Sequence, residues 1–257
     1  MRSFPGSHRF VLCVLFRCLF RLTVQTYVLY NECIAIRDRM RLNGRLNGRL
    51  HGWTADVGEV MDRMTQHFTK YLTNAYHHFM TISRHKLEVG KNCFRCGLYR
   101  QGILHDLSKY GPTEFLVGVK YYQGDRSPNE AEREDKGVTT SWLHHKGRNK
   151  HHLEYWVDYD ITRKKGGMTG MKMPDEYIVE MFCDRVAASK IYQGENYTDE
   201  SALKYFLHGK GKTMLHPYSE KKLTLLLEKL AKDGEEETFR YAKRYMKAYR
   251  RYKRKKK

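Results

Sequence analysis

The chain has few of the residues that mark an all-β or a disulfide-stabilised protein. Only 5 prolines and 3 tryptophans occur in 257 residues, and no regular series of alternating apolar and polar runs is bounded by turn residues. The 6 cysteines form no dense framework, which favours a reduced interior and a cytoplasmic protein over disulfides. Frequent lysine, arginine, leucine, methionine and tyrosine instead predict an all-α fold.

The chain also lacks an apolar run of the length that a membrane-spanning helix needs. Residues 10–16 are apolar, but Arg17 and Arg21 interrupt the segment that follows, whereas a span takes about 20 largely apolar residues. No clear small-x-small cleavage site ends the segment as in a signal peptide. We expect an extension outside the functional fold, with an amphipathic targeting segment or a membrane anchor as alternatives, and we do not expect stable membrane insertion.

The composition changes abruptly near residue 60. Every basic residue among the first fifty is an arginine, and the first lysine of the chain is Lys70. Residues 41–50 repeat Arg-Leu-Asn-Gly and have no apolar period on which to build a core. We predict three parts: a poorly structured or targeting extension at 1–60, a metal-binding helical domain at 64–195, and C-terminal helices with a basic tail at 196–257.

Basic residues outnumber acidic ones by 48 to 29, which gives a formal net charge of +19. This charge favours contact with phosphate esters, nucleic acid or a lipid surface, but it does not choose among them. Residues 240–257 contain no acid, and Tyr241, Tyr245 and Tyr249 recur every four residues. The pattern predicts a basic C-terminal helix with an aromatic stripe, either partly packed on the protein or in contact with nucleic acid.

Two expected helices carry the first polar side chains of interest. One helix starts near Met64, and His85 continues its apolar face. The next helix is expected to keep His105, Asp106 and Lys109 on one side. The other members of the first face are Phe68, Leu72, Ala75, Phe79 and Ile82. Those of the second face are Leu98 and Gly102.

Three further segments follow from turn and helix signals. A third helix is expected to open at Pro112. Its inward side chains should be Phe115, Leu116 and Val119. Residues 123–137 are polar and rich in turn formers, which predicts a surface loop, and residues 163–173 form a connector rich in glycine, lysine and methionine.

A later helix is expected to start at Pro174 and to place Asp184 in an apolar stripe. The other members of that stripe are Tyr177, Met181, Ala188 and Ile191. Burial of an uncompensated carboxylate is prohibitive, so a metal ion, a cation or a proton must accompany Asp184. Shorter helices should follow at 199–208 and 219–233.

Histidines and aspartates are the candidate metal ligands. The full set is His85, His105, Asp106, His144, His145, His151, His152 and Asp184. Imidazole and carboxylate together suit a divalent transition metal, although a lone histidine on an apolar face is more often a core residue. The Cys93-x-x-Cys96 pair could hold zinc, but no second pair has suitable spacing, so structural cysteines are favoured.

The order His85, His105-Asp106, Asp184 resembles that of the HD superfamily of metal-dependent phosphohydrolases. The doublet followed by Lys109 resembles the His-Asp-x-x-Lys version found with two-metal sites. Residues 105–110 and 144–156 are similar to the signatures HDLSKY and HHKxxNKHHxEYW of an uncharacterised bacterial HD-like family. The resemblance implies an HD-like helical bundle, and no Gly-Tyr-Pro motif follows the histidines as in the cyclic-dinucleotide phosphodiesterases.

The resemblance implies hydrolysis of a phosphate ester, expected to be nucleotide-like, by metal-activated water. One or two ions of Mn, Fe, Zn, Co or Ni would bind to the eight candidate ligands, with Asp106 and Lys109 in catalytic roles. The expected substrate-binding residues are Lys109, Lys146, Arg148 and Lys150, the last three also compatible with a solvated loop. Asn149 and Glu154 could orient ligands. The alternatives are a di-iron redox or oxygenase-type HD protein and a non-catalytic nucleic-acid-binding helical protein.

Overall fold

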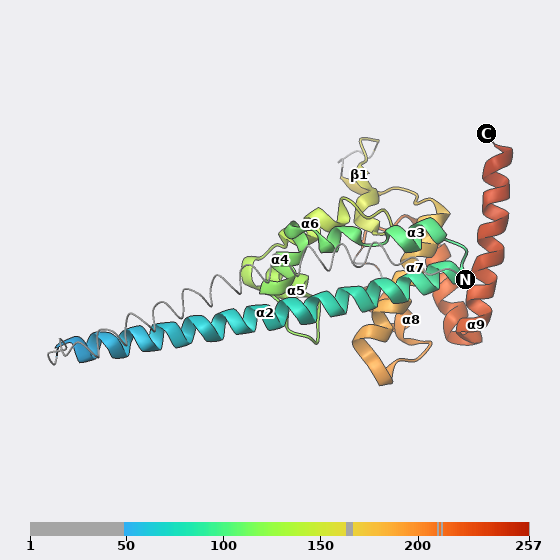
Figure 1. Ribbon diagram of the computed structural model, residues 1–257. Coiled ribbons are helices and arrows are strands. Elements are labelled where there is room, and N and C mark those ends of the chain that lie inside the picture. Colours follow the sequence, from blue (N-terminus) through green and yellow to red (C-terminus); the bar gives the residue numbers. More distant parts are fainter. Residues whose placement is uncertain (1–48, 163–166, 210, 212, 257) are drawn as a thin grey trace. The chain divides into compact units, whose positions relative to one another are not determined.

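The computed structural model describes residues 49–162, 167–209, 211 and 213–256 (Figure 1). Most of the predicted extension at 1–60 lies outside these residues. The chain divides into two units, Met1–Lys70 and Tyr71–Lys257. All eight candidate metal ligands belong to the second unit.

Helices dominate the described residues, which confirms the prediction of an all-α fold (Figure 1). They are α2 (Arg49–Arg95), α3 (Tyr99–Leu104), α4 (Pro112–Lys120), α5 (Pro128–Lys136), α6 (Thr140–Lys146), α7 (Asp175–Gln193), α8 (Ser201–Gly209) and α9 (Pro217–Lys255). Single 3-10 turns lie at Leu107–Tyr110, Leu153–Trp156 and Gly194–Asn196. No helix among the described residues is long and apolar enough to cross a membrane.

The helix predicted from Met64 is part of α2, which begins earlier and ends later than expected. In the second unit its buried face includes Ala75, Ile82 and His85, as the apolar period indicates, and it continues to Val89. Leu87 is exposed because it lies off this face. The apolar period therefore located His85 correctly on the inward side of the helix.

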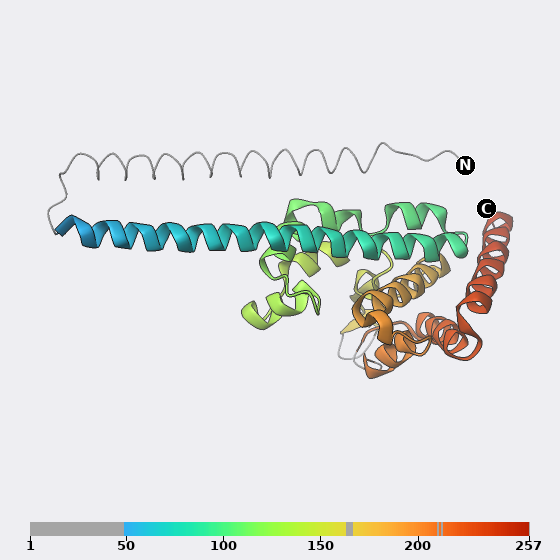
Figure 2. The ribbon, with the colours of Figure 1, turned by 60° about the horizontal axis from the view of Figure 1, so that its bottom comes forward.

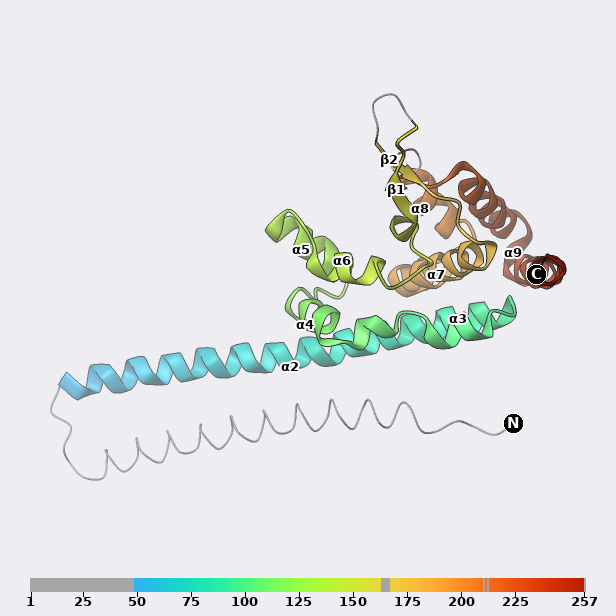
Figure 3. The same ribbon diagram turned by 90° about the horizontal axis from the view of Figure 1, so that it is seen from above.

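The core of the second unit joins the last turns of α2 to α7 and α9. Figures 2 and 3 show α7 beside α9, the pair with the most extensive contact. Fully buried members of this core are Val89, Cys93, Phe182, Val186, Leu223, Leu227, Phe239 and Met246. Burial of each large side chain contributes about 1.5–3 kcal/mol, and this packing fixes α7, the helix that carries Asp184.

Cys93, Cys96 and Cys183 lie in this core as free, buried thiols. The sulfur atoms of Cys96 and Cys183 are 3.7 Å apart, and burial raises the pKa of the Cys183 thiol well above its usual range. These cysteines are not among the side-chain groups of the described chain that could hold a metal ion. Their surroundings fit the structural role that the sequence favours for Cys93 and Cys96.

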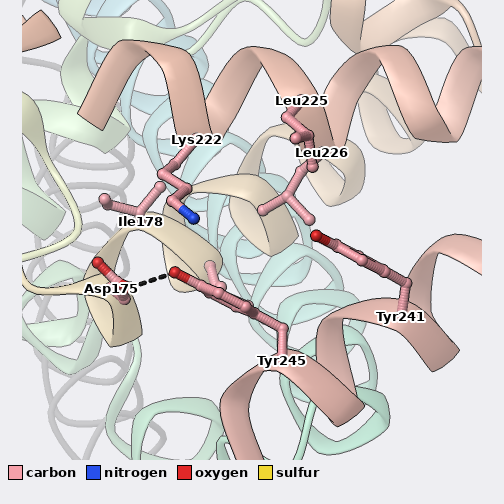
Figure 4. A pocket seen from close by; sticks show the side chains of 8 residues that line it. Asp175, Ile178, Lys222, Leu225, Leu226, Tyr241 and Tyr245 are labelled. Atoms are coloured by element: carbon pink, nitrogen blue, oxygen red, sulfur yellow. Dashed lines mark hydrogen bonds between the residues drawn. The ribbon is translucent and has the colours of Figure 1, made fainter. Parts of the chain in front are cut away.

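The aromatic stripe of the basic tail packs against the start of α7 (Figure 4). Tyr218 donates a hydrogen bond of 3.1 Å to Asp175, and Tyr245 donates another to the same carboxylate. The Lys253 ammonium lies 2.7 Å from Glu176. The hollow beside Asp175 has a volume of about 10 Å³, room for at most one water molecule. This joint therefore holds α9 on α7 and leaves no room for a ligand.

The predicted surface loop at 123–137 is wrong, because it contains α5. Ser127 accepts a hydrogen bond from the amide of Asn129, Pro128 occupies the first turn, and Gly137 ends the helix with a φ of 73°. These are ordinary start and stop signals for a helix. The polar composition concealed them, since only one side of so short a helix is buried.

Two smaller expectations also need correction. Leu116 is 52% exposed, whereas Phe115 and Val119 are buried as predicted, because α4 offers only one narrow side to the core. The connector at 163–173 includes a strand, β2 (Met168–Gly170), paired antiparallel with β1 (Val157–Tyr159). A Cβ atom on Gly170 would lie 1.9 Å from the carbonyl oxygen of Met214, so this hairpin depends on glycine there. Residues 163–166 are outside the described chain.

Candidate metal centre

The His105-Asp106 doublet lies between two helical segments and not within one helix, contrary to the sequence prediction. α3 ends at Leu104, and Asp106 has a φ of 52°. It is the one non-glycine residue of the described chain with a positive φ. Such a backbone costs about 1–2 kcal/mol for an L-residue, a strain typical of functional sites. The bend directs two adjacent side chains inward, which a regular helix would separate by about 100°.

Lys86 of α2 stabilises this bend from outside. Its ammonium donates hydrogen bonds to the carbonyl oxygens of Ile103, at 2.8 Å, and His105, at 2.7 Å. These are carbonyl groups that the end of a helix leaves without partners. The lysine therefore satisfies the end of α3 and fixes the position of the doublet next to His85.

The first group of candidate ligands brings together three parts of the chain. His85 Nε2 of α2 lies 2.9 Å from Asp184 Oδ1 of α7. His105 Nε2 lies 3.4 Å from Asp106 Oδ2 and 3.7 Å from Asp184 Oδ1. These four residues are the set that the sequence predicts for one ion.

The second group lies on the other side of the Asp106 carboxylate. His145 Nε2 and His151 Nε2 are each 3.4 Å from Asp106 Oδ1. His152 Nε2 lies 2.9 Å from His145 Nε2. One donor atom each from Asp106, His145, His151 and His152 falls within 4.8 Å of the others. Each carboxylate oxygen of Asp106 therefore faces a different ligand group.

Five central polar atoms of the two groups are buried and make no hydrogen bond of regular geometry with a described residue, although His85 Nε2 lies 2.9 Å from Asp184 and Asp106 Oδ2 lies 2.7 Å from Lys109. The five atoms are His85 Nε2, His105 Nε2, His151 Nε2, Asp106 Oδ1 and Asp106 Oδ2. Buried polar atoms without partners are costly and rare. Imidazole nitrogens and a carboxylate are ligands for divalent transition metals. The buried histidines and aspartates could thus hold a metal ion, and their unpartnered atoms fit that use.

Two glutamates that the sequence analysis missed hold the outer nitrogens of the histidines. Glu180 Oε1 accepts from His105 Nδ1 at 3.1 Å and from His151 Nδ1 at 3.3 Å. An acceptor at Nδ1 keeps the proton there and leaves Nε2 free to bind a metal. Glu180 lies one helical turn before Asp184 on α7, a spacing visible in the sequence.

Glu114 does the same for the second group. Its two oxygens accept from His144 Nδ1 at 2.6 Å and from His145 Nδ1 at 2.8 Å. His144 is outside the groups that could share an ion, so the structure does not bring this predicted ligand to the centre. Its adjacent position on α6 turns it toward Glu114 instead.

Charges of opposite sign keep the carboxylates ionised. Burial works against the charge of Asp106, but His105 and Lys109 hold its pKa well below the usual range. Burial likewise opposes the charge of Asp184, but the neighbouring imidazoles of His105 and His85 lower its pKa well below the usual range. Both aspartates are therefore available as anionic ligands at neutral pH.

The predicted substrate-binding cations separate into two kinds. Lys109 Nζ lies 2.7 Å from Asp106 Oδ2 and lines a cavity of about 140 Å³ beside the second ligand group. Lys146, Arg148 and Lys150 do not line this cavity. Arg148 and Lys150 are exposed, which agrees with the solvated-loop alternative.

A larger cavity of about 480 Å³ adjoins both ligand groups. Its lining includes His151 and Asp184, and also Arg185, which is not among the residues predicted to bind a substrate. Glu154 lines the same cavity. Asn149 donates to Ser108 Oγ at 3.0 Å and to the carbonyl oxygen of His145 at 2.9 Å, contacts through which it could orient His145.

Residues 74–233 match the model of a family of unknown function (DUF5662). No curated protein and no solved structure matches the chain. The matching stretch is more than half of the chain, and it contains all eight candidate ligands together with Glu114 and Glu180. The chain therefore belongs to the family of unknown function DUF5662.

Proposed function

We propose that the chain is a metal-dependent phosphohydrolase with two divalent transition-metal ions held on either side of Asp106. The observation that carries the proposal is the position of this carboxylate. Oδ1 faces His145 and His151 and makes no hydrogen bond among the described residues, whereas Oδ2 faces His105 and pairs with Lys109. A carboxylate between two sets of imidazole donors is the arrangement that bridges a pair of ions.

Bound divalent ions would supply a water molecule of lowered pKa and positive charge for a phosphate group. The protein's own groups prepare the rest of the site. Glu180 and Glu114 hold the histidine rings with Nε2 directed inward. Lys109 keeps a fixed positive charge beside Asp106, where it can bind a phosphate oxygen that gains charge during the reaction.

The resemblance to the HD superfamily supports the same reaction class. Its ligand order corresponds to His85, His105-Asp106 and Asp184, residues that lie within 4 Å of their neighbours here. The two-metal version of the doublet corresponds to Asp106 followed by Lys109. The likeness in sequence is a reason for the proposal that is separate from the chemistry of the donor set.

The test is phosphate release from para-nitrophenyl phosphate and from nucleoside monophosphates, measured for the full chain reconstituted with manganese, cobalt or iron. We expect metal-dependent release that is abolished by chelation and by Asp106→Ala. A protein that binds iron, becomes coloured and releases no phosphate from any of these substrates would contradict the proposal and favour a di-iron redox protein.

A further inference from the structure

Arg185 has no anionic partner within the described chain. It follows Asp184 on α7, its Nε is buried without a hydrogen bond, and no carboxylate lies within ion-pair distance. Its guanidinium carbon lies 5.5 Å from the centre of the Phe206 ring. The carboxylates of Asp184 and Glu154 act on this cation only from beyond ion-pair distance. A largely buried cation without a direct ion pair is costly for the folded protein, so the position is better explained by an anion that comes from outside.

The large cavity beside the metal centre gives that anion a place. Arg185 lines it together with the candidate ligands His151 and Asp184, and its volume of about 480 Å³ is typical of small-molecule sites. The other arginine of the lining, Arg126, already makes a two-point ion pair with Glu134 at 2.7 and 2.8 Å. One arginine thus remains for a ligand.

The charge balance of the cavity limits how many phosphate groups it can accept. Its lining also contains acidic side chains at Asp125, Glu130 and Glu154. A chain of phosphates would meet these carboxylates without enough cations to neutralise it. The lining therefore favours a ligand with a single phosphate group.

The remaining surface of the cavity suits an aromatic ligand. Trp142, Tyr192 and Tyr205 line it, together with Met181 and Leu153. Aromatic side chains bind planar rings through stacked or edge contacts. A phosphate monoester with a ring system would use both the arginine and the aromatic side of the same cavity.

We propose that Arg185 binds the phosphate group of such a ligand, and that the substrate class is a monophosphate ester of an aromatic or heterocyclic compound. The substrate class rests on the proposed function, whereas the binding of a phosphate group by Arg185 does not. Arg185 presents a planar fork of donors that matches two phosphate oxygens. Asp184, the preceding residue, connects this anion site to the metal centre.

The experiment uses inorganic phosphate and phenyl phosphate as probes, titrated by calorimetry into the full chain as purified and after chelation. Arg185→Met should weaken phosphate binding about 10- to 100-fold in both forms, the range of a hydrogen-bonded charge pair. Arg244→Met, which removes an exposed arginine on α9, should leave phosphate binding unchanged. Phenyl phosphate should bind more tightly than phosphate to the unaltered chain.

Thermal melting separates ligand binding from a structural role. Without ligand, Arg185→Met should melt at the same or a higher temperature, because an unpaired cation is removed. Phosphate should raise the melting temperature of the unaltered chain and not that of the variant. Arg185→Lys, which keeps the charge, should retain part of the affinity and serves if the methionine variant does not fold.

Equal phosphate affinity in the unaltered chain and in Arg185→Met or Arg185→Lys would overturn the assignment of Arg185. Equal affinity for phosphate and phenyl phosphate would overturn the aromatic substrate class. A chain that binds no metal but loses phosphate binding with Arg185→Met would contradict the proposed reaction and leave the anion site supported.

Discussion

Lys109 Nζ lies 2.7 Å from Asp106 Oδ2, on the carboxylate that both ligand groups share. Burial lowers the pKa of this lysine, but the negative charges of Asp106 and Asp184 raise it by more. The pKa of Lys109 thus lies above its usual value. The ammonium is therefore charged at neutral pH. A cation next to a metal-binding carboxylate repels metal ions, which indicates that Lys109 serves the substrate and not the metal.

Lys109→Met should separate metal binding from catalysis. We expect unchanged or tighter metal binding, because a competing charge is removed, and a fall in the rate of phosphate release of about 100-fold. Elemental analysis and turnover on para-nitrophenyl phosphate measure the two quantities on one preparation. Loss of bound metal in this variant would contradict the assigned role, since it would make Lys109 part of the support of the ligands.

Glu180→Gln and Glu114→Gln should each weaken metal binding. A glutamine retains the shape of the side chain but is a poorer acceptor for the imidazole Nδ1 proton, and outer partners of this kind contribute about 10- to 100-fold to affinity. Competition with a fluorescent chelator measures the change. Glu88→Gln, which affects a carboxylate paired with Lys91 and Lys190, is the matched control. Metal affinity equal to that of the control would show that Glu180 and Glu114 do not support the metal ligands.

The sequence predicted the members of the centre better than its outer support. His85 could be found because α2 keeps a regular apolar period, and Asp184 because a carboxylate in an apolar stripe needs compensation. Glu180 lies one turn before Asp184, a spacing that the sequence shows, but the use of Glu180 and Glu114 as acceptors depends on which histidine nitrogens approach them in space. Arg185 is adjacent to Asp184 in the sequence, and this position turns it about a quarter-turn away from the aspartate on a helix, so the residue pattern does not indicate the cavity that Arg185 lines.

Local backbone conformation was the second feature that limited the prediction from sequence. The spacing of His105, Asp106 and Lys109 fits one helix, and nothing in the residue pattern marks the left-handed conformation of Asp106. That conformation is imposed by the surrounding contacts, including Lys86. For α5 the signals were present at Ser127 and Pro128, but the absence of an apolar period outweighed them in the prediction.

Gly118→Ala should destabilise the protein through His78. A Cβ atom at this position of α4 would lie 2.1 Å from His78 Nε2, and the buried ring already packs against Phe115 and Tyr122. We expect a loss of about 1–3 kcal/mol in the free energy of unfolding, measured by urea denaturation. The helical control Gly90→Ala should be neutral or stabilising.

The double variant Gly118→Ala/His78→Ala tests the cause of that loss. Removing the ring makes room for the new methyl group, so the two substitutions together should cost less than the sum of the separate effects. Strict additivity would show that the destabilisation does not come from the contact between Gly118 and His78.

Glu132 should make stability depend on pH in the acid range. Burial opposes its charge, but hydrogen bonds from Thr139 and Thr140 outweigh burial and lower its pKa from 4.5 to about 2. A lowered pKa in the folded state gives stability that is present above pH 4.5 and lost as the pH falls toward 2. The same carboxylate holds the start of α6, the helix of His145.

Glu132→Gln should lower the free energy of unfolding at pH 7 by about 1–3 kcal/mol, and the difference from the unaltered chain should shrink below pH 4.5. Urea denaturation over a pH series measures it, with the exposed Glu195→Gln as the control. A difference that stays constant across the series would show that ionisation of Glu132 does not contribute.

The central claim, that Asp106 bridges two metal ions, is tested most directly by elemental analysis of the full chain after reconstitution, beside Asp106→Ala and the exposed control Asp158→Ala. If Asp106 bridges two ions, the unaltered chain and the control should each hold two equivalents of transition metal, and Asp106→Ala should lose both. No bound metal in the unaltered chain, or two equivalents retained by Asp106→Ala, would contradict it.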